Sequence, residues 1–236
     1  MPNGILIIDK PSGWTSMDVC AKIRGILHEK RVGHGGTLDP MATGVLPVFA
    51  GQATRAVEFA ENSRKEYVAG LRLGQVTDTQ DVTGETLEKR PVTIYELKLL
   101  EQVSETDYLF RCVCSKGTYI RTLCHDIGQA LGCGGTLYSL RRTMAAGYTT
   151  AMAHTLEEVQ DRGESLLQPI DTLFAQYPAY TVPSAGKETR VRNGGAVTDN
   201  DLPDSTYRVY GRNGDFLCLS RAQHGTLTSI KNFFGA

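Results

Sequence analysis

The chain has 236 residues, of which 41% are hydrophobic and 22% are charged. This composition supports a sizeable core and excludes wholesale disorder, and the length suits one large domain with a small appendix. The net charge of −1 argues mildly against a generic nucleic-acid-binding domain, whose pI usually exceeds about 9. The mean hydropathy is −0.23, and no apolar run approaches the ~20 residues that span a bilayer.

The N-terminal segment has no basic region and no cleavage site around its short apolar run, so it does not resemble a signal peptide. We therefore expect a soluble, cytoplasmic protein without membrane contact. The six cysteines include no Cys-x-x-Cys pair, and the five histidines include no His-x-x-x-His pair. These spacings predict reduced, structural thiols and no metal site.

The first predicted elements are a strand and a helix. Residues 4–9 (Gly-Ile-Leu-Ile-Ile-Asp) form a short apolar run that is typical of a buried strand. Thr15 and Asp18 then resemble an acidic capping box, and apolar residues at helical spacing predict a helix from about 16 to 29. Residues 33–36 (Gly-His-Gly-Gly) are too rich in glycine for either regular element, so we expect a loop there.

The middle of the chain alternates between strand and helix signals. Apolar and polar residues alternate over 66–73 and again over 108–114, which predicts two half-buried strands. Residues 120–131 have helical spacing, and Thr155 with Glu158 forms another capping box. The order of these elements predicts an α+β fold with a mixed or antiparallel central sheet flanked by helices.

The C-terminal part has a different character. Two prolines mark a boundary within residues 169–183, and the short β-like segments 207–210 and 216–219 flank an Asn-Gly hairpin signal. The sequence therefore predicts a main domain over 1–177 and a small β-rich domain over 178–236.

Residues with special backbone properties, above all glycine, are most concentrated around Asp39. Three glycines precede this carboxylate, and Thr43-Gly44 follows it. An aspartate before proline is more often a turn residue or a cap. However, a glycine-rich loop lets the backbone approach a ligand closely, and loops on rigid scaffolds often carry catalytic side chains. The residues alone leave both interpretations open.

This segment resembles the catalytic-aspartate motif of the bacterial tRNA pseudouridine-55 synthase family (TruB type). Other family-like motifs follow in family order over nearly the whole chain, namely residues 10–16 (Lys-Pro-Ser-Gly-Trp-Thr-Ser), 64–67 (Arg-Lys-Glu-Tyr), 77–84 (Thr-Asp-Thr-Gln-Asp-Val-Thr-Gly), 114–121 (Cys-Ser-Lys-Gly-Thr-Tyr-Ile-Arg) and 140–143 (Leu-Arg-Arg-Thr). The C-terminal part resembles the PUA-type RNA-binding module of such enzymes. The resemblance implies a pseudouridine synthase-like fold with this module at its end.

The resemblance also implies an activity, the isomerisation of uridine to pseudouridine at position 55 in the T-arm of tRNA, without cofactor or metal. The reaction breaks the C1′–N1 bond, rotates the uracil and rejoins it through C5. A carboxylate suffices for this chemistry, either by adding to C6 or by attacking C1′. By resemblance, Asp39 is that carboxylate, and both routes remain open.

The resemblance assigns roles to four further residues. Arg121 matches the arginine that holds the catalytic carboxylate, a role that suits its guanidinium fork. Tyr67 matches the tyrosine that stacks on the target base and takes part in proton removal from C5. His34 matches the residue that fills the space left by the flipped base, and Leu140 matches an apolar wall of the pocket.

The remaining candidates concern RNA binding. Lys10 and Asp78 are expected to contact RNA or to support the site. Contacts to phosphate, which position RNA without reading its sequence, are expected from Arg55, Arg64, Lys65, Arg141 and Arg142. The implied partner is the tRNA T-arm, read chiefly by its shape. The chain has no apolar repeat that would pair two copies, so we expect a monomer.

The chain departs from the family pattern after about residue 90. Family members carry there a helix and a long insertion with a Pro-Pro-x-Tyr-Ser-Ala-x-Lys motif and an RNA-gripping thumb, whereas residues 88–95 pass straight through. This difference predicts weak tRNA binding and slow turnover. The alternative function is therefore a catalytically impaired tRNA-binding or folding-chaperone version of the scaffold. A hydrolase that uses His34 with Asp39 is a weaker third hypothesis.

Overall fold

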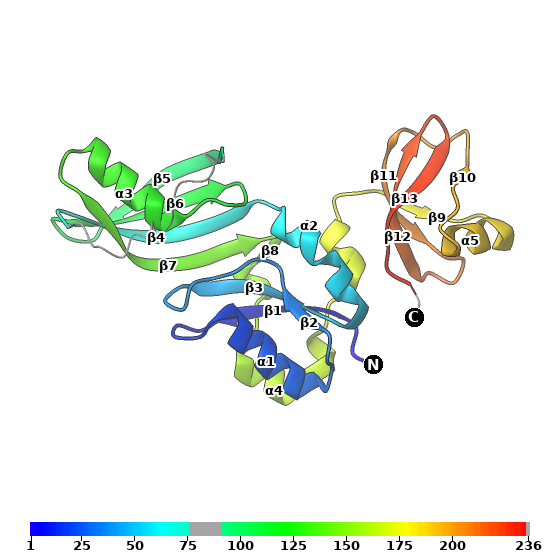
Figure 1. Ribbon diagram of the computed structural model, residues 1–236, viewed down its shortest axis with the longest axis horizontal. Coiled ribbons are helices and arrows are strands. Elements are labelled where there is room, and N and C mark those ends of the chain that lie inside the picture. Colours follow the sequence, from blue (N-terminus) through cyan, green and yellow to red (C-terminus); the bar gives the residue numbers. More distant parts are fainter. Residues whose placement is uncertain (76–90, 235–236) are drawn as a thin grey trace, which may run out of the picture.

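The computed structural model describes residues 1–75 and 91–234 (Figure 1). Its α-helices are α1 (Ser16–Leu27), α2 (Val57–Glu61), α3 (Ile120–Ala130), α4 (Leu156–Arg162) and α5 (Ala185–Arg192). Its strands are β1 (Gly4–Lys10), β2 (Val32–His34), β3 (Thr43–Ala50), β4 (Lys65–Leu73), β5 (Ile94–Gln102), β6 (Asp107–Cys114), β7 (Gly135–Ala145), β8 (Tyr148–Thr149), β9 (Ala179–Thr181), β10 (Val197–Thr198), β11 (Ser205–Tyr210), β12 (Phe216–Gln223) and β13 (Thr226–Asn232). None of the described helices is long and apolar enough to cross a membrane.

The main sheet has the strand order β1-β3-β7-β4-β6-β5, with β2 added to β3 and β8 added to β7. The β3–β7 pair is parallel, and the other neighbouring pairs are antiparallel. Figure 1 shows α1 and α4 beside the β1–β3 half of this sheet and α3 beside the β4–β6 half. The predicted α+β class with a mixed sheet is confirmed.

Local signals in the sequence determine the first helix as predicted. The backbone N–H of Asp18 donates to Oγ1 of Thr15 at 3.0 Å, and the backbone N–H of Thr15 donates to Oδ2 of Asp18 at 2.9 Å. This reciprocal pair satisfies two N–H groups that a helix start leaves without partners. The helix buries Val19, Cys20 and Ile23 against the main core.

The prediction of a loop over residues 33–36 is wrong for Gly33 and His34. Val32–His34 forms strand β2, which pairs with β3 so that Gly33 lies opposite Phe49. The glycines permit close packing rather than preventing a strand. A Cβ atom on Gly35 would lie 2.7 Å from Cβ of Ala60, closer than real side chains approach one another.

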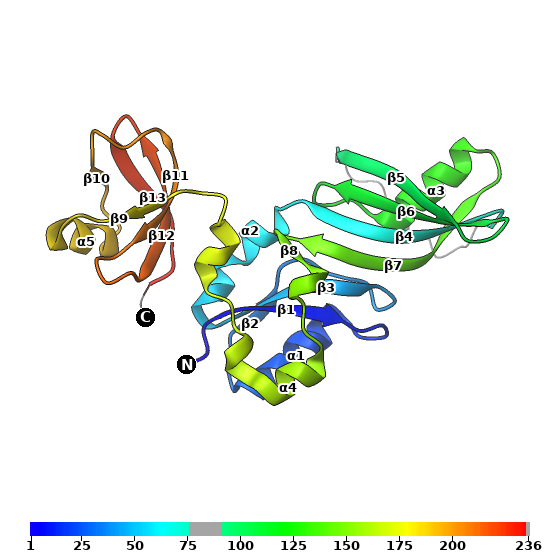
Figure 2. The same ribbon diagram turned by 180° about the vertical axis from the view of Figure 1, so that it is seen from behind.

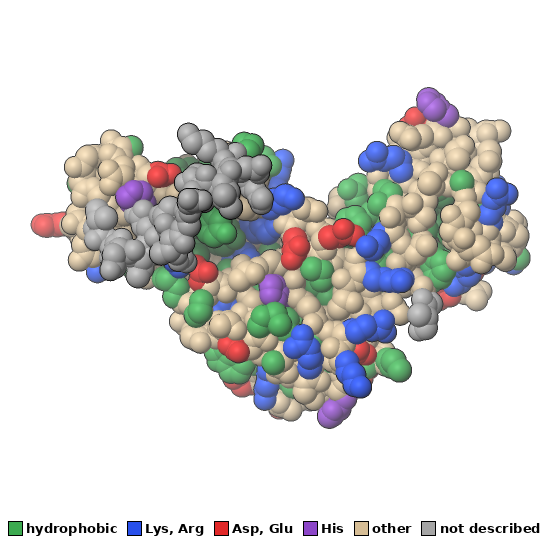
Figure 3. Space-filling view, viewed as in Figure 1, with side chains coloured by type: hydrophobic (Ala, Val, Ile, Leu, Met, Phe, Trp, Pro, Cys, Tyr) green, Lys and Arg blue, Asp and Glu red, His purple; other side chains and the backbone are tan. Residues whose placement is uncertain are grey.

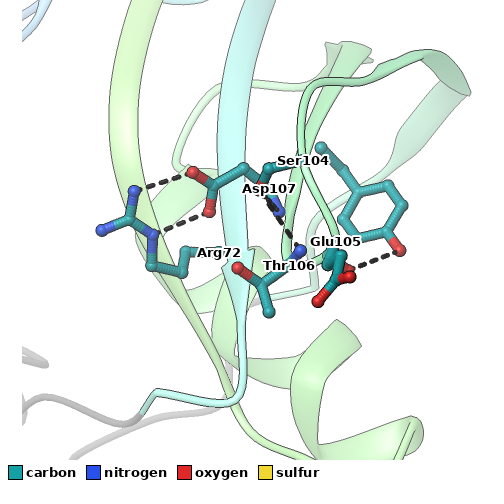
Figure 4. Close-up of polar contacts among 6 residues, drawn as sticks. Arg72, Ser104, Glu105, Thr106 and Asp107 are labelled. Carbon is teal, nitrogen blue, oxygen red and sulfur yellow. Dashed lines mark hydrogen bonds and ion pairs between the residues drawn. The ribbon is translucent and has the colours of Figure 1, made fainter.

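The hairpin that joins β5 to β6 is held by side chains at its turn. Arg72 on β4 forms a bidentate ion pair with Asp107 (Figure 4). Its Nε donates to Oδ1 and its Nη2 donates to Oδ2 of the carboxylate, each at 2.7 Å. Oγ of Ser104 accepts from the backbone N–H of Asp107 at 3.0 Å. The turn is therefore tied to the neighbouring strand β4.

The C-terminal residues form a second sheet with the strand order β10-β13-β12-β11-β9, beside which α5 lies (Figure 2). The predicted hairpin is confirmed, since β11 and β12 pair antiparallel and Gly214 takes the left-handed φ of 86° in the turn between them. The rings of Phe174, Phe216 and Phe233 pack together with centroids 5.3–6.1 Å apart. This aromatic cluster joins the second sheet to the main unit.

Candidate active site

A cavity of about 530 Å³ opens between the Asp39 loop, the start of β4 and the N-terminus of α3. Its lining includes four of the residues predicted for the site, Asp39, Tyr67, Arg121 and Leu140. They come from four segments of the chain. The fold therefore brings together side chains that the sequence separates by up to 101 positions.

Asp39 and Arg121 face each other at the mouth of the cavity. Nη2 of Arg121 donates to Oδ2 of Asp39 at 2.8 Å. The aspartate side chain is 49% exposed and the arginine side chain is 30% exposed, so the carboxylate is accessible from solvent. The guanidinium compensates the carboxylate charge and orients the group without enclosing it.

Lys10 lies beneath the Asp39 loop and is fully buried. Its Nζ donates to the carbonyl oxygens of Pro11 at 3.0 Å, Trp14 at 2.6 Å and Pro40 at 3.3 Å. Burial, with the nearby charge of Arg142 as a second cause, lowers the pKa of Lys10 from its usual value. An amine in this position does not contact RNA directly. It supports the turn that follows Asp39.

A second link ties the first motif to the same loop. Oγ of Ser16, at the start of α1, accepts from the backbone N–H of Leu38 at 2.8 Å and lies 3.2 Å from its carbonyl oxygen. The backbone N–H of Gly13 donates to the carbonyl of Pro40 at 2.8 Å. The residues on either side of Asp39 are thus bonded to the segment that follows β1.

Arg142 forms the floor of the cavity, and its burial corrects the expected phosphate contact. Only 1% of the residue is exposed. Its guanidinium donates to the carbonyls of Val45 at 2.7 Å, Gly36 at 3.0 Å and Thr37 at 3.3 Å. Its charge also acts on the nearby phenol of Tyr67. These partners are internal, so Arg142 holds the backbone before Asp39 and does not meet a phosphate.

Tyr67 and Leu140 provide apolar surface inside the cavity. Tyr67 lies on β4 and is 8% exposed, and the half-buried Leu140 lies on the adjacent strand β7, opposite Ala69. Burial raises the pKa of the Tyr67 phenol, while the charge and hydrogen bond of Arg142 oppose this effect. The phenol is therefore neutral near pH 7 and presents a flat ring to the cavity.

Lys65 also lies at the floor of the cavity, and its burial again corrects an expected phosphate contact. The residue is 6% exposed, and its Nζ donates to the carbonyls of Ala60, Glu61 and Ser63. Burial lowers the pKa of Lys65 to about 8, with the charge of Arg142 as a second cause. The Lys65 ammonium therefore satisfies carbonyl groups at the C-terminal end of α2.

Besides Lys10, the predicted site residues His34 and Arg141 lie outside the cavity lining. His34 is half-buried in β2, and its Nδ1 is buried without a hydrogen-bond partner among the described residues. Burial lowers the pKa of His34. Arg141 pairs with Asp9 through contacts of 3.0 and 2.7 Å, and its side chain remains 42% exposed. Asp78 lies outside the described residues.

The remaining two arginines are exposed or partly exposed, as a phosphate contact requires. Arg55 donates to the backbone carbonyl of Asn232 at 3.3 Å, next to the second sheet. Arg64 is exposed, and its guanidinium lies 4.0 Å above the ring of Tyr95.

One aromatic residue at the mouth of the cavity was not predicted as a site residue. Tyr119 lines it, directly before α3, and is 77% exposed. A large exposed aromatic ring beside a cavity is a platform on which a base can stack. The signal in the sequence that could have identified Tyr119 is its position two residues before Arg121.

Comparisons with known proteins agree with this geometry. Residues 24–90 match the family model of the TruB family pseudouridylate synthase N-terminal domain. Residues 121–175 match the model of the tRNA pseudouridylate synthase B C-terminal domain. A tRNA pseudouridine synthase B from Thermobifida fusca is 33% identical, with all of both chains covered. The chain belongs to the TruB family. The resemblance inferred from the motifs is thereby confirmed.

Other members of the TruB family and related structures extend the comparison. The tRNA pseudouridine synthase B of Alkaliphilus oremlandii is 35% identical over 89% of this chain and 88% of its own. Among solved structures, a chain in an H/ACA RNP bound to a substrate RNA containing 2′-deoxyuridine superposes with a TM-score of 0.83. That chain is 27% identical, and the match covers 99% of this chain and 86% of that one.

The alignment with the Thermobifida fusca relative also shows a difference in length. It runs over 297 positions, although this chain has 236 residues. The relative therefore carries about 60 residues that have no counterpart here.

Proposed function

We propose that this chain isomerises uridine to pseudouridine at position 55 in the T-arm of tRNA. The observation that carries the proposal is the Asp39–Arg121 ion pair at the mouth of a cavity walled by Tyr67 and Leu140. Membership of the TruB family and the names of the relatives support the same reaction and the same class of RNA.

The uridine must leave the RNA stack before the carboxylate can reach it. The cavity of about 530 Å³ lies within the range of ordinary small-molecule sites, so it accommodates a flipped nucleoside. In the proposed complex the uracil lies between the ring of Tyr67 and the side chain of Leu140. Tyr119 stacks on a neighbouring base at the mouth.

The reaction is balanced within the nucleotide itself. Asp39 adds to C6 or attacks C1′, the C1′–N1 bond breaks, the uracil turns, and a C1′–C5 bond forms. A base then removes the proton from C5, N1 gains a proton from solvent, and the carboxylate is released unchanged. We propose that the side chains alone support these steps, without a metal ion or cofactor.

The remaining residues have supporting roles in this proposal. Arg121 orients the Asp39 carboxylate, while Arg142 and Lys10 hold the loop on either side of it. The hydroxyl of Tyr67 is the candidate to take part in removal of the C5 proton, giving its own proton to solvent as it accepts that one. We propose that His34, which lies on the strand that leads into the loop, occupies the space left by the flipped base.

RNA binding is proposed to involve both units, with residues 1–177 as the catalytic domain and residues 178–236 as a PUA-like RNA-binding domain. Arg190, Arg212 and Arg221 are exposed on the second unit. Lys and Arg side chains gather along the face where the two units meet (Figure 3). Such side chains neutralise phosphates without reading sequence. Because the chain lacks about 60 positions present in a relative, we expect weak binding and slow turnover.

The test is to map pseudouridine in tRNA. Unmodified tRNA transcripts are incubated with the chain, and the product is mapped by mass spectrometry at nucleotide resolution. The proposal predicts one pseudouridine, in the T-arm at position 55, formed also in an isolated T-arm hairpin. Modification at a different uridine would contradict the T-arm assignment. Binding of the hairpin without any pseudouridine would favour the folding-chaperone alternative.

A further inference from the structure

The cavity has more basic than acidic side chains in its described lining. Its charged residues are two carboxylates and four cations, namely Asp39, Glu61, Lys65, Lys116, Arg121 and Arg142. A concave site with a surplus of positive charge attracts anions. The partners that each cation already has inside the protein determine which of the four can bind such an anion.

Three of these cations are committed to groups of their own chain. Arg121 donates to the carboxylate of Asp39. Arg142 and Lys65 are buried, and both donate to backbone carbonyls. An incoming anion would have to displace these partners, which would leave buried polar groups or a carboxylate without compensation. The three side chains therefore support the site.

Lys116 differs from the other three cations. It lies on the loop between β6 and α3 and is exposed. Its Nζ donates to the neutral Oδ1 of Asn62 at 2.6 Å, and no carboxylate among the described residues forms an ion pair with it. Its charge still acts inside the cavity, because it is one of the causes that lower the pKa of Lys65. Lys116 can therefore meet an anion without giving up an acidic partner.

The backbone of Lys116 is held on both sides. The N–H of Ser115 donates to the carbonyl of Thr93 at 2.9 Å, and the N–H of Thr93 donates to Oγ of Ser115 at 2.9 Å. Oγ1 of Thr118 donates to the carbonyl of Ser115 at 3.0 Å, and Gly117 takes the left-handed φ of 78° that this turn requires. A loop that is already ordered loses little entropy when it binds a ligand.

We propose that Lys116 binds a phosphate that flanks the flipped uridine and so holds the ribose–phosphate at the rim of the cavity. The inference rests on the proposed function, because it takes the flipped nucleotide of the T-arm as the ligand. A nucleotide within an RNA strand has a phosphate on each side, so a uridine that enters the cavity brings two anions to its rim. The ribose needs such an anchor because the C1′–N1 bond to the uracil is broken during the reaction.

This role is distinct from that of Arg121. The phosphate is present before and during the reaction, so its contact with Lys116 stabilises the ground state and the transition state alike. Such a contact lowers KM and leaves the rate of the bound complex nearly unchanged. Arg121 instead faces the carboxylate that reacts.

The test uses T-arm hairpins in which one phosphate at a time is made neutral. A methylphosphonate linkage replaces the phosphate on the 5′ side or the 3′ side of the uridine at position 55. The adjoining 2′-oxygen carries a methyl group to protect the linkage, and each hairpin is compared with a reference that has the same methyl group and an ordinary phosphate. Affinities are measured by titration for the wild-type chain and for Lys116→Met.

The wild-type chain should bind one of the two methylphosphonate hairpins about tenfold more weakly than its reference, as loss of one charge-assisted hydrogen bond predicts. Lys116→Met should bind the reference about tenfold more weakly than the wild type and should lose nothing further on that methylphosphonate. The slope of log affinity against log salt concentration should fall by about one. In kinetics the loss should appear in KM.

Two further variants serve as controls. Lys116→Arg keeps a cation at the rim and should retain most of the affinity and the sensitivity to the methylphosphonate. Lys22→Met removes an exposed lysine on α1 that does not line the cavity, and it should bind every hairpin like the wild type. Circular dichroism verifies that all variants are folded.

The proposal is overturned if the wild-type chain is insensitive to both methylphosphonates or if Lys116→Met keeps the wild-type affinity. It is also overturned if Lys116→Met remains as sensitive as the wild type at both linkages. A chain that binds the hairpins in the expected pattern but forms no pseudouridine would contradict the proposed reaction and not the role of Lys116, because the phosphate test measures binding alone.

Discussion

The floor and the mouth of the cavity each contain an arginine, in opposite surroundings. Arg142 at the floor is 1% exposed and donates to three backbone carbonyls. The Arg121 side chain at the mouth is 30% exposed and donates to the carboxylate of Asp39. A buried charge is tolerated only when its donors are satisfied, so the floor arginine is committed to the backbone. Exposure to solvent, rather than residue type, therefore distinguishes the arginine that supports the backbone from the arginine that faces the candidate catalytic carboxylate.

The largest effect is expected at the floor. Arg142→Met removes the guanidinium and leaves the buried carbonyls of Gly36, Thr37 and Val45 without their donor. With roughly 1 kcal/mol for each unsatisfied group, the free energy of unfolding should fall by about 3 kcal/mol. Urea unfolding followed by circular dichroism measures this loss.

The neighbouring residue provides the matched control. Arg141→Met removes an arginine that is 42% exposed and paired with Asp9. An exposed ion pair contributes about 1 kcal/mol or less, so this variant should remain close to the wild type. Equal losses for the two variants would contradict the distinction between a buried support and an exposed pair.

The next effect is expected at the mouth, and it concerns rate rather than stability. Arg121→Ala removes the cation that faces Asp39, and loss of one such charged donor lowers turnover on the order of 10²-fold. The affinity for a T-arm hairpin should change far less. Single-turnover kinetics and a binding titration on the same RNA separate the two quantities. A loss confined to affinity would show that Arg121 only holds RNA.

A further effect is a pH dependence at the floor. Burial lowers the pKa of Lys65 to about 8, whereas the unfolded chain keeps this proton up to about 10.5. Between these values the unfolded state binds more protons, so Lys65 makes the free energy of unfolding rise with pH. Below about 8 both states are protonated, and the slope disappears.

Urea unfolding across this pH window tests the sign. The wild-type chain should gain stability relative to Lys65→Met as the pH rises from about 8 towards 10.5. Lys22→Met removes an exposed amine on α1 and should keep the wild-type slope. Parallel curves for the wild type and Lys65→Met would rule out a depressed pKa at Lys65.

The parts of the fold that the sequence predicted well carry local signals. The capping box of Thr15 and Asp18 and the alternation along β4 determine their elements within a few residues. Strand β7 was not predicted, although it lies at the centre of the sheet. It contains Arg141 and Arg142 and no strict alternation, and its position follows from pairing with β3 and β4, far away in the sequence.

In the site, too, some features were predicted from the sequence and others were not. The motifs identified the residues that the cavity brings together, Asp39, Tyr67, Arg121 and Leu140. They did not reveal that Lys10, Lys65 and Arg142 are buried. A basic side chain is normally exposed, and these three are buried where backbone carbonyl oxygens accept their hydrogen bonds. The acceptors of Arg142 are 97 to 106 positions away in the sequence, whereas those of Lys65 lie within five residues of it. The motifs do not show which carbonyl oxygens the folded backbone turns towards these side chains.

The central claim is that Asp39 carries the isomerisation, and release of the C5 hydrogen tests it most directly. An unmodified T-arm hairpin labelled with tritium at uracil C5 is mixed with excess chain, and label released into water is counted. The wild-type chain should release the label, slowly, from one uridine. Asp39→Asn should bind the hairpin with similar affinity and release none. Release by Asp39→Asn at the wild-type rate would contradict the account.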